Sequence, residues 1–216
     1  MSHQVDLFWS FRSPYSYLAM PRLIELEQEW DLTVNVRPVY PIAIRDPGFF
    51  SNISPLWVPY LQNDTRRVAE QLGMTFLWPK PDPVVMDMKT RRIAEEQPHI
   101  HRLTRLGIAA VERGRGLAFL SEVSHLIFSG IENWHHGDHL GQATARAGLD
   151  LGELDAAIAD DEARHEAAIK ANEAALEKAG HWGVPTLAFE GEAFFGQDRI
   201  ELCLWRMRQA GLKPRP

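Results

Sequence analysis

The strongest constraint on the fold is that strand-forming sequence occurs only at the two ends of the chain. Residues 5–10 and 33–40 carry the apolar and β-branched side chains typical of strands, and a helix-forming stretch over 14–29 separates them. This order predicts a β-α-β unit with a right-handed crossover. Residues 186–189 and 193–195 predict a later hairpin. Neither end supplies enough strands for a stable sheet, so the two ends must meet in space.

The middle of the chain is predicted to be mostly helical. Pro, Gly and Asn interrupt residues 41–83, where one short helix is expected over 57–72. Residues 86–180 are predicted as almost continuous helix with glycines as breaks or caps. A last helix is expected over 198–209, with Asp198 as its N-cap.

These patterns predict an α/β domain that is divided by a helical insertion. The α/β domain would comprise residues 1–45 and 181–216, and the all-helical insertion would comprise residues 46–180. A chain of 216 residues is long enough to bury a large core without disulfides.

Composition excludes several classes of function. The net charge of −6 gives no obvious electrostatic footprint for binding nucleic acid or an anionic membrane. No apolar run approaches the roughly 20 residues that span a membrane. The first residues lack a basic stretch followed by an apolar one, so we expect no signal peptide and a cytoplasmic protein. The single cysteine, Cys203, excludes an intramolecular disulfide and any CxxC redox or zinc pair.

The most informative motif is Ser-Pro-Tyr-Ser at residues 13–16, between the first predicted strand and the first helix. Serine followed by proline makes a favourable N-cap and first helical residue, and the cap is worth about 1 kcal/mol. Capping alone would explain the motif. Two prolines suggest more: Pro21 lies eight residues after Ser13, and Pro185 lies just before the late strand.

This combination resembles the thioredoxin superfamily. There, an active-site Cys-x-x-Cys motif starts the first helix, a proline often follows eight residues after the first cysteine, and a cis-proline faces the active site. Residues 13–16 resemble such a motif with oxygen in place of both sulfurs. The resemblance implies a thioredoxin-like domain with an all-helical insertion and a cis peptide bond before Pro185.

Within that superfamily, the sequence most closely resembles the kappa-class glutathione transferases and the 2-hydroxychromene-2-carboxylate isomerases, which have a DsbA-like architecture. Residues 11–19 resemble the N-terminal motif of these families, and residues 182–186 and 194–199 resemble the C-terminal one. The resemblance implies glutathione as cofactor, a small aromatic substrate and a homodimer.

Ser13 is the expected catalytic residue. Its hydroxyl would donate a hydrogen bond to a bound thiolate, and the helix N-terminus favours an anion at the same point. Together these effects would lower the pKa of the thiol. The thiol must come from a bound molecule because Cys203 belongs to the last predicted helix, and the resemblance implies glutathione. Covalent serine catalysis is not expected, because Ser13 has no adjacent base and no Gly-x-Ser-x-Gly motif.

The resemblance also implies the contacts that hold glutathione. The expected binding residues are Asn52, Val184, Pro185, Gln197 and Asp198. The backbone of Val184 would pair with the cysteinyl main chain, Gln197 and Asp198 would hold the γ-glutamyl end, and Asn52 would contact the glycyl end. The family has a lysine near Gln62 that is absent here, so Arg66 or Arg67 is the alternative contact for the glycyl carboxylate.

A flat aromatic substrate would need an apolar slot between the α/β domain and the insertion. The candidate walls are Trp57, Phe76 and Trp78. Ordinary core packing is the alternative role for each of these side chains.

No metal site is expected. His135 and His139 are four residues apart, but Gly137 interrupts any helix between them. Glu162 and His165 form half of a di-iron motif whose second half is missing. The first pair therefore predicts a loop, and the second predicts a solvated helix face.

Three functions remain open from the sequence. The leading one is a glutathione-dependent isomerase that interconverts 2-hydroxychromene-2-carboxylate-like hemiketals and trans-o-hydroxybenzylidenepyruvate-like open forms by reversible thiolate addition. The alternatives are a kappa-type glutathione transferase and a non-catalytic thioredoxin-like binding protein. A disulfide oxidoreductase is disfavoured because Ser13 and Ser16 cannot form a disulfide.

Overall fold

The core of the molecule is one four-stranded sheet built from both ends of the chain. In the computed structural model, which describes residues 3–87 and 90–216, the strands are β1 (His3–Trp9), β2 (Leu32–Pro38), β3 (Thr186–Phe189) and β4 (Glu192–Phe195). Their order is β2-β1-β3-β4. β1 pairs parallel with β2 and antiparallel with β3, which pairs antiparallel with β4. The prediction that the two ends meet is therefore confirmed.

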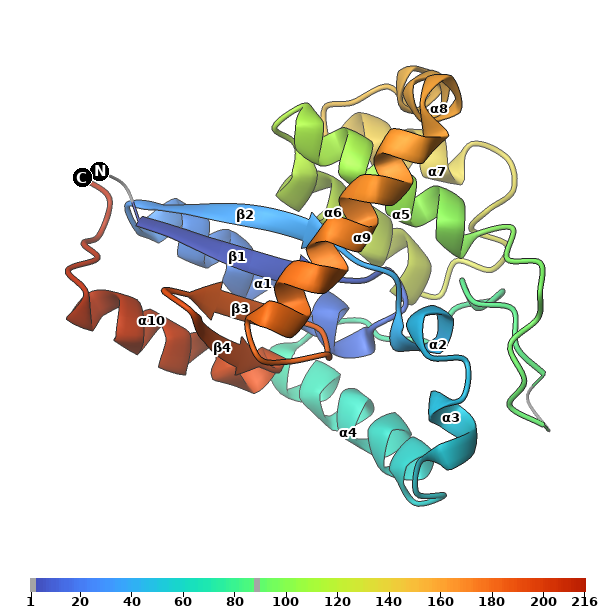
Figure 1. The fold of residues 1–216 in the computed structure, drawn as a ribbon, viewed down its shortest axis with the longest axis horizontal. Coiled ribbons are helices and arrows are strands. Elements are labelled where there is room, and N and C mark those ends of the chain that lie inside the picture. Colours follow the sequence, from blue (N-terminus) through green and yellow to red (C-terminus); the bar gives the residue numbers. More distant parts are fainter. Residues whose placement is uncertain (1–2, 88–89) are drawn as a thin grey trace.

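The helices fall into two groups. Those at the ends of the chain are α1 (Pro14–Glu29), the 3₁₀ turn η1 (Gln197–Arg199) and α10 (Ile200–Gln209). Those between are α2 (Ile42–Arg45), α3 (Phe49–Asn52), α4 (Trp57–Leu72), α5 (Ile100–Glu112), α6 (Gly116–Phe128), α7 (His139–Arg146), α8 (Leu151–Asp160) and α9 (Glu162–Lys178). Figure 1 shows α5 to α8 gathered at one end of the sheet, with α4 apart from them. Within the described residues, no helix is both long and apolar enough to cross a membrane.

Successive side chains of β1 point to opposite faces of the sheet, and helices cover both faces. Leu7 is fully buried in the main core with residues of α1 and α10, including Leu18 and Cys203. Phe8 points to the opposite face, where it packs with Leu176 of α9. Figure 1 shows α9 in front of the sheet and α1 behind it. A strand with both faces covered needs apolar residues at successive positions, as β1 has.

The prediction of almost continuous helix over residues 86–180 is wrong for the first part of that range. In its described part before Ile100, the chain forms turns and an isolated bridge between Met86 and Ile93. The buried Gln97 amide donates to the carbonyls of Val85 (2.8 Å) and Ala94 (2.9 Å) and accepts from the Val85 N–H (2.9 Å). These side-chain bonds replace the backbone bonds that a helix would supply.

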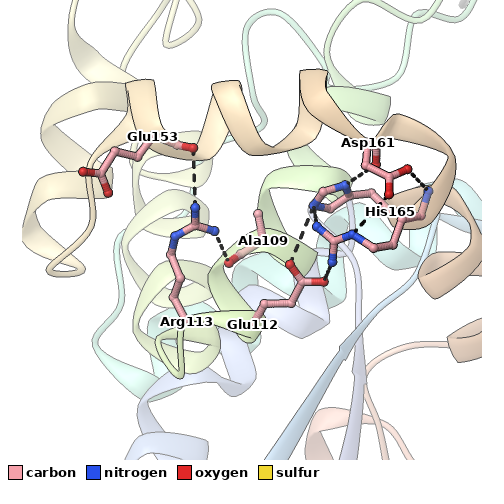
Figure 2. Close-up of polar contacts among 7 residues, drawn as sticks. Ala109, Glu112, Arg113, Glu153, Asp161 and His165 are labelled. Atoms are coloured by element: carbon pink, nitrogen blue, oxygen red, sulfur yellow. Dashed lines mark hydrogen bonds and ion pairs between the residues drawn. The ribbon is translucent and has the colours of Figure 1, made fainter.

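His165 lies in the interior, which corrects the prediction of a solvated helix face. Its side chain has no exposed area, its Nδ1 donates to the Asp161 carbonyl at 2.7 Å, and its Nε2 lies 3.8 Å from a Glu112 oxygen (Figure 2). Arg164 also pairs with Glu112. The first turn of α9 packs against α5, and this packing covers the imidazole.

Candidate functional site

Ser13 lies where β1 leads into α1, and it caps the helix as predicted. Its backbone is extended (φ −85°, ψ 113°), and its hydroxyl oxygen accepts the Ser16 N–H at 3.2 Å. Pro14 occupies the first turn, where its missing N–H costs nothing. The turn is closed by the Ser13 N–H, which donates to the Ser10 carbonyl at 3.2 Å.

The same hydroxyl reaches the other end of the chain. Ser13 Oγ donates to the Val184 carbonyl at 3.1 Å. As expected, the Val184–Pro185 peptide bond is cis. The start of α1 and the segment before β3 therefore face each other, and the Ser13 hydroxyl and the Val184 backbone lie within one hydrogen bond. A thiolate bound at Ser13 would replace the Val184 carbonyl as acceptor of that proton.

Ser16, the second serine of the motif, has a different environment. Its side chain is fully buried, and its Oγ has no hydrogen-bond partner among the described residues. Ser13 is half-buried. Only Ser13 of the two therefore presents a hydroxyl that a bound molecule could reach.

Gln197 and Asp198 lie in the 3₁₀ turn η1, so the prediction that Asp198 caps the last helix is wrong. α10 begins at Ile200 without a side-chain cap, and the Asp198 carboxylate instead pairs with Arg199 at 2.6 Å. The turn follows Gly196, whose φ of 108° suits glycine and displaces the start of α10. Gln197 Oε1 accepts a hydrogen bond from Arg22 on α1.

The other expected glutathione contacts come from α3 and α4. Asn52 ends α3, and Gln62 lies on α4; both are exposed. Arg66 pairs with Glu70 on the solvent face of α4 at 3.0 Å, whereas no ion pair within the described chain involves Arg67. Within the described chain, no side-chain hydrogen bond or ion pair joins these residues to Ser13, so their roles stay predictions.

A tyrosine–aspartate pair beside the serine motif was not predicted from the sequence. The Tyr15 hydroxyl donates to Asp64 Oδ2 at 2.6 Å, and Tyr60 donates to the other oxygen at 3.3 Å. Burial raises the Tyr15 pKa, and the bond to Asp64 raises it further. The Asp198 carboxylate also acts on Tyr15 through space. Tyr15 thus joins α1 to α4 at the γ-glutamyl end of the expected site.

Arg12, the residue before Ser13, is held by a second unpredicted pair. Its guanidinium makes two bonds to the Asp82 carboxylate, at 2.8 and 2.9 Å, and lies 5.3 Å from the centre of the Phe50 ring. A bidentate, partly buried pair of this kind fixes the side chain and neutralises its charge. Arg12 and Asp82 are 70 residues apart, so no local sequence pattern predicts their ion pair.

The three candidate walls do not form one slot. Phe76 is partly buried and packs against both Tyr17 (6.4 Å) and Phe128 (5.7 Å) at the border of the core. Trp78 contacts Phe76 and lines a separate pocket with Leu77 and Lys80. Trp57 packs against Phe49 (6.2 Å) and Phe50 (6.0 Å). Trp57 contacts Phe50, which lies beside Arg12, whereas Phe76 contacts Tyr17, so these two walls adjoin the serine motif at different residues.

Cys203 is fully buried on α10, and burial raises the pKa of its thiol to about 12. This thiol cannot supply a nucleophile at neutral pH. Across residues 3–87 and 90–216, no cluster of three or more histidine, cysteine or acidic residues could hold a metal ion.

A capped helix N-terminus that contacts a cis-proline segment at one end of a four-stranded sheet defines a thioredoxin-like site. The chain belongs to the DsbA-like thioredoxin domain family, whose model matches residues 4–207.

Several known proteins are similar to this chain. A 2-hydroxychromene-2-carboxylate isomerase from Pseudomonas putida is 33% identical over 79 residues, which cover 35% of this chain and 39% of the relative. The chain therefore matches well under half the length of that curated relative. A solved 2-hydroxychromene-2-carboxylate isomerase superposes with a TM-score of 0.72 at 19% identity, covering 96% of this chain and 95% of the other. The cytosolic disulfide reductase DsbM from Pseudomonas aeruginosa, solved with GSH, superposes with a TM-score of 0.62 at 17% identity. This superposition covers 96% of this chain and 99% of DsbM. At these identities the solved structures establish a shared fold.

Proposed function

We propose that the protein is a glutathione-dependent isomerase acting on 2-hydroxychromene-2-carboxylate-like substrates. The observation that carries the proposal is the Ser13 hydroxyl, which caps α1 and lies 3.1 Å from the Val184 carbonyl. With oxygen at both motif positions and Cys203 buried, the thiol must be borrowed. The curated isomerase relative and the glutathione-bound neighbour support this choice of reaction and cofactor.

Ser13 would stabilise the glutathione thiolate. The hydroxyl donates to sulfur, and the partial positive charge at the start of α1 favours the anion. Val184 would pair its backbone groups with the cysteinyl main chain beside Pro185. Gln197 and Asp198 would hold the γ-glutamyl carboxylate and ammonium, and Asn52 the glycyl end.

The reaction needs no redox chemistry. The thiolate adds to an unsaturated carbon of the hemiketal form, the ring double bond shifts, and the ring C–O bond breaks, which leaves an enol and a phenolate. The enol proton passes to the phenolate when the enol becomes the ketone. Rotation about the transient single bond follows. The C–S bond then breaks and its electron pair returns to sulfur, which regenerates the thiolate and leaves the trans open-chain pyruvate. Substrate and product therefore have the same atoms and electrons.

Two other activities compete with this proposal. A kappa-type transferase would use the same Ser13 but retain the thiol in a conjugate. A non-catalytic thioredoxin-like protein would use the cis-proline face to bind a partner. Disulfide reduction of the DsbM kind is disfavoured because Ser13 and Ser16 cannot cycle through a disulfide.

We further propose that the protein is a homodimer and that it is located in the cytoplasm.

Product analysis separates the candidates. The protein is incubated with glutathione and the chromene carboxylate, and the mixture is resolved by chromatography. The isomerase predicts open-chain product with full recovery of free glutathione. A stable conjugate would establish the transferase instead. If no product forms and glutathione gives no thermal stabilisation, the non-catalytic alternative holds.

A further inference from the structure

An exposed aromatic surface lies directly before the cis-proline. It consists of Phe49, His181, Trp182 and Phe195, which we call the Trp182 surface. Trp182 and Phe195 expose 47% and 41% of their area, large fractions for such apolar side chains. The His181 ring stacks on Phe195 at 4.0 Å and on Trp182 at 5.3 Å, both with an interplanar angle of 18°. Phe49 lies 5.3 Å from Trp182.

This surface is held in place by its own packing. A Cβ atom on Gly183 would lie 2.4 Å from a Phe195 ring carbon, so only glycine leaves room for that ring. The Gly183 N–H donates to His181 Nδ1 at 2.8 Å, which fixes the imidazole. Burial lowers the His181 pKa, which favours the neutral ring. The rings therefore form a preorganised stacking surface.

The surface adjoins the proposed thiol site from two directions. Trp182 is two residues before Val184, whose carbonyl accepts the Ser13 hydroxyl. On the other side, Phe49 packs on Phe50 at 5.3 Å, and Phe50 lies under the Arg12 guanidinium. The Trp182 surface is thus connected to the proposed thiol site through the backbone on one side and through ring contacts on the other.

A cation without an ion pair lies at the edge of this surface. Arg45 donates to the Trp182 carbonyl at 2.7 Å and to the Tyr40 carbonyl at 2.8 Å. No carboxylate of the described chain lies within ion-pair distance of it, although Glu173 and Glu177 act on it from further away. Arg12, by contrast, is neutralised by Asp82. A guanidinium remains protonated at any physiological pH, so Arg45 offers its charge to a carboxylate.

We propose that the Trp182 surface and Arg45 form the subsite for the substrate of this reaction, a planar aromatic carboxylate whose ring stacks on Trp182 and whose acid group pairs with Arg45. This inference rests on the proposed function for the position of the thiol. In this proposal, the aromatic wall of the substrate slot is formed by residues beside the cis-proline and not by Phe76 and Trp78, which pack elsewhere.

The test measures binding of coumarin-3-carboxylate, a stable planar aromatic acid, by calorimetry. Trp182→Ala is expected to weaken binding about tenfold, and Trp182→Phe to restore most of it. Trp205→Ala is the matched control, because Trp205 is equally exposed (50%) but lies on α10 against Arg206; it should bind as the wild type does. Equal affinity in the wild type and Trp182→Ala would overturn the subsite.

The role of Arg45 is tested with the uncharged parent coumarin. Arg45→Gln should lose the preference for the acid over coumarin, whereas Arg45→Lys should keep part of it. A preference unchanged in Arg45→Gln would contradict the charge assignment. Glutathione stabilisation of each variant is measured in parallel. If glutathione still stabilises the variants while Trp182→Ala binds coumarin-3-carboxylate as tightly as the wild type, the subsite is wrong and the proposed function stands. If glutathione stabilises neither the wild type nor the variants, the proposed function is wrong, whatever the result for the subsite.

Discussion

The two serines of the 13–16 motif have different physical environments. Ser13 Oγ accepts a hydrogen bond from the Ser16 N–H and donates one to the Val184 carbonyl. Ser16 Oγ is buried with no partner in the described chain. In the described chain, the oxygen at the second position therefore makes no hydrogen bond, whereas the oxygen at the first caps a helix and bonds to the residue before the cis-proline.

Ser13→Ala should lower turnover about 10- to 100-fold, which corresponds to the loss of one hydrogen bond to a charged group. The lost cap should cost about 1 kcal/mol of unfolding free energy. Steady-state kinetics and urea denaturation measure the two effects. Ser16→Ala is the control and should leave both nearly unchanged. If Ser13→Ala loses stability but keeps full turnover, its hydroxyl is structural only.

Cys203 should be inert in the folded protein. Its thiol is buried and its pKa is raised to about 12, so almost no thiolate forms at neutral pH. A chromogenic disulfide reagent should detect no free thiol in the native protein and one after denaturation. Cys203→Ala should retain full glutathione-dependent turnover. A large loss of turnover in a variant that folds normally would contradict the borrowed-thiol mechanism.

At the scale of elements, the orientation of α4 against α1 depends on a polar contact. Tyr15 follows the cap of α1, and its hydroxyl donates to Asp64 on α4 at 2.6 Å. This bond links α1 to the helix that carries Arg66 and Arg67, the alternative contacts proposed for the glycyl carboxylate. Because the carboxylate favours the protonated phenol, the bond raises the Tyr15 pKa in addition to burial.

Tyr15→Phe and Asp64→Asn should each destabilise the protein by about 1–3 kcal/mol, and the double variant by less than their sum. The raised Tyr15 pKa makes this contribution fully present below about pH 10, the unfolded value, and lost as pH rises further. Denaturation at several pH values measures it. Additive single effects would show that the two side chains are not coupled.

Local signals in the sequence predict elements better than they predict contacts. The cap at Ser13, the helix over 57–72 and the final hairpin follow from short-range chemistry, and the structure has them there. The Gln97 bonds that replace helix before Ile100 depend on a side chain satisfying distant backbone groups. Hydrophobic periodicity in the sequence does not predict such hydrogen bonds. The partners of Tyr15 and Arg12 are equally non-local.

At the scale of the whole molecule, the site exists only because the two ends of the chain pack together. The Ser13–Val184 hydrogen bond joins residues 171 positions apart, and β1 lies between β2 and β3. A ligand that contacts both Ser13 and Asp198 would therefore bind the folded state alone. Such binding stabilises the whole fold by mass action.

Glutathione should raise the unfolding free energy by about 1.4 kcal/mol at ten times its dissociation constant. Asp198→Ala should need a higher glutathione concentration for the same rise in melting temperature. Asp160→Ala, an exposed carboxylate at the end of α8, is the control and should match the wild type. An identical glutathione response in Asp198→Ala would remove Asp198 from the γ-glutamyl site.

The central claim is that Ser13 and the N-terminus of α1 stabilise a borrowed thiolate. Its most direct test is a pH titration of the ultraviolet thiolate absorbance of glutathione bound to the wild type and to Ser13→Ala. We expect the bound thiol of the wild type to titrate well below the value of about 8.5 for a free cysteine thiol, and that of Ser13→Ala to return toward it. A bound thiol that titrates like free glutathione, or identically in both proteins, would contradict the claim.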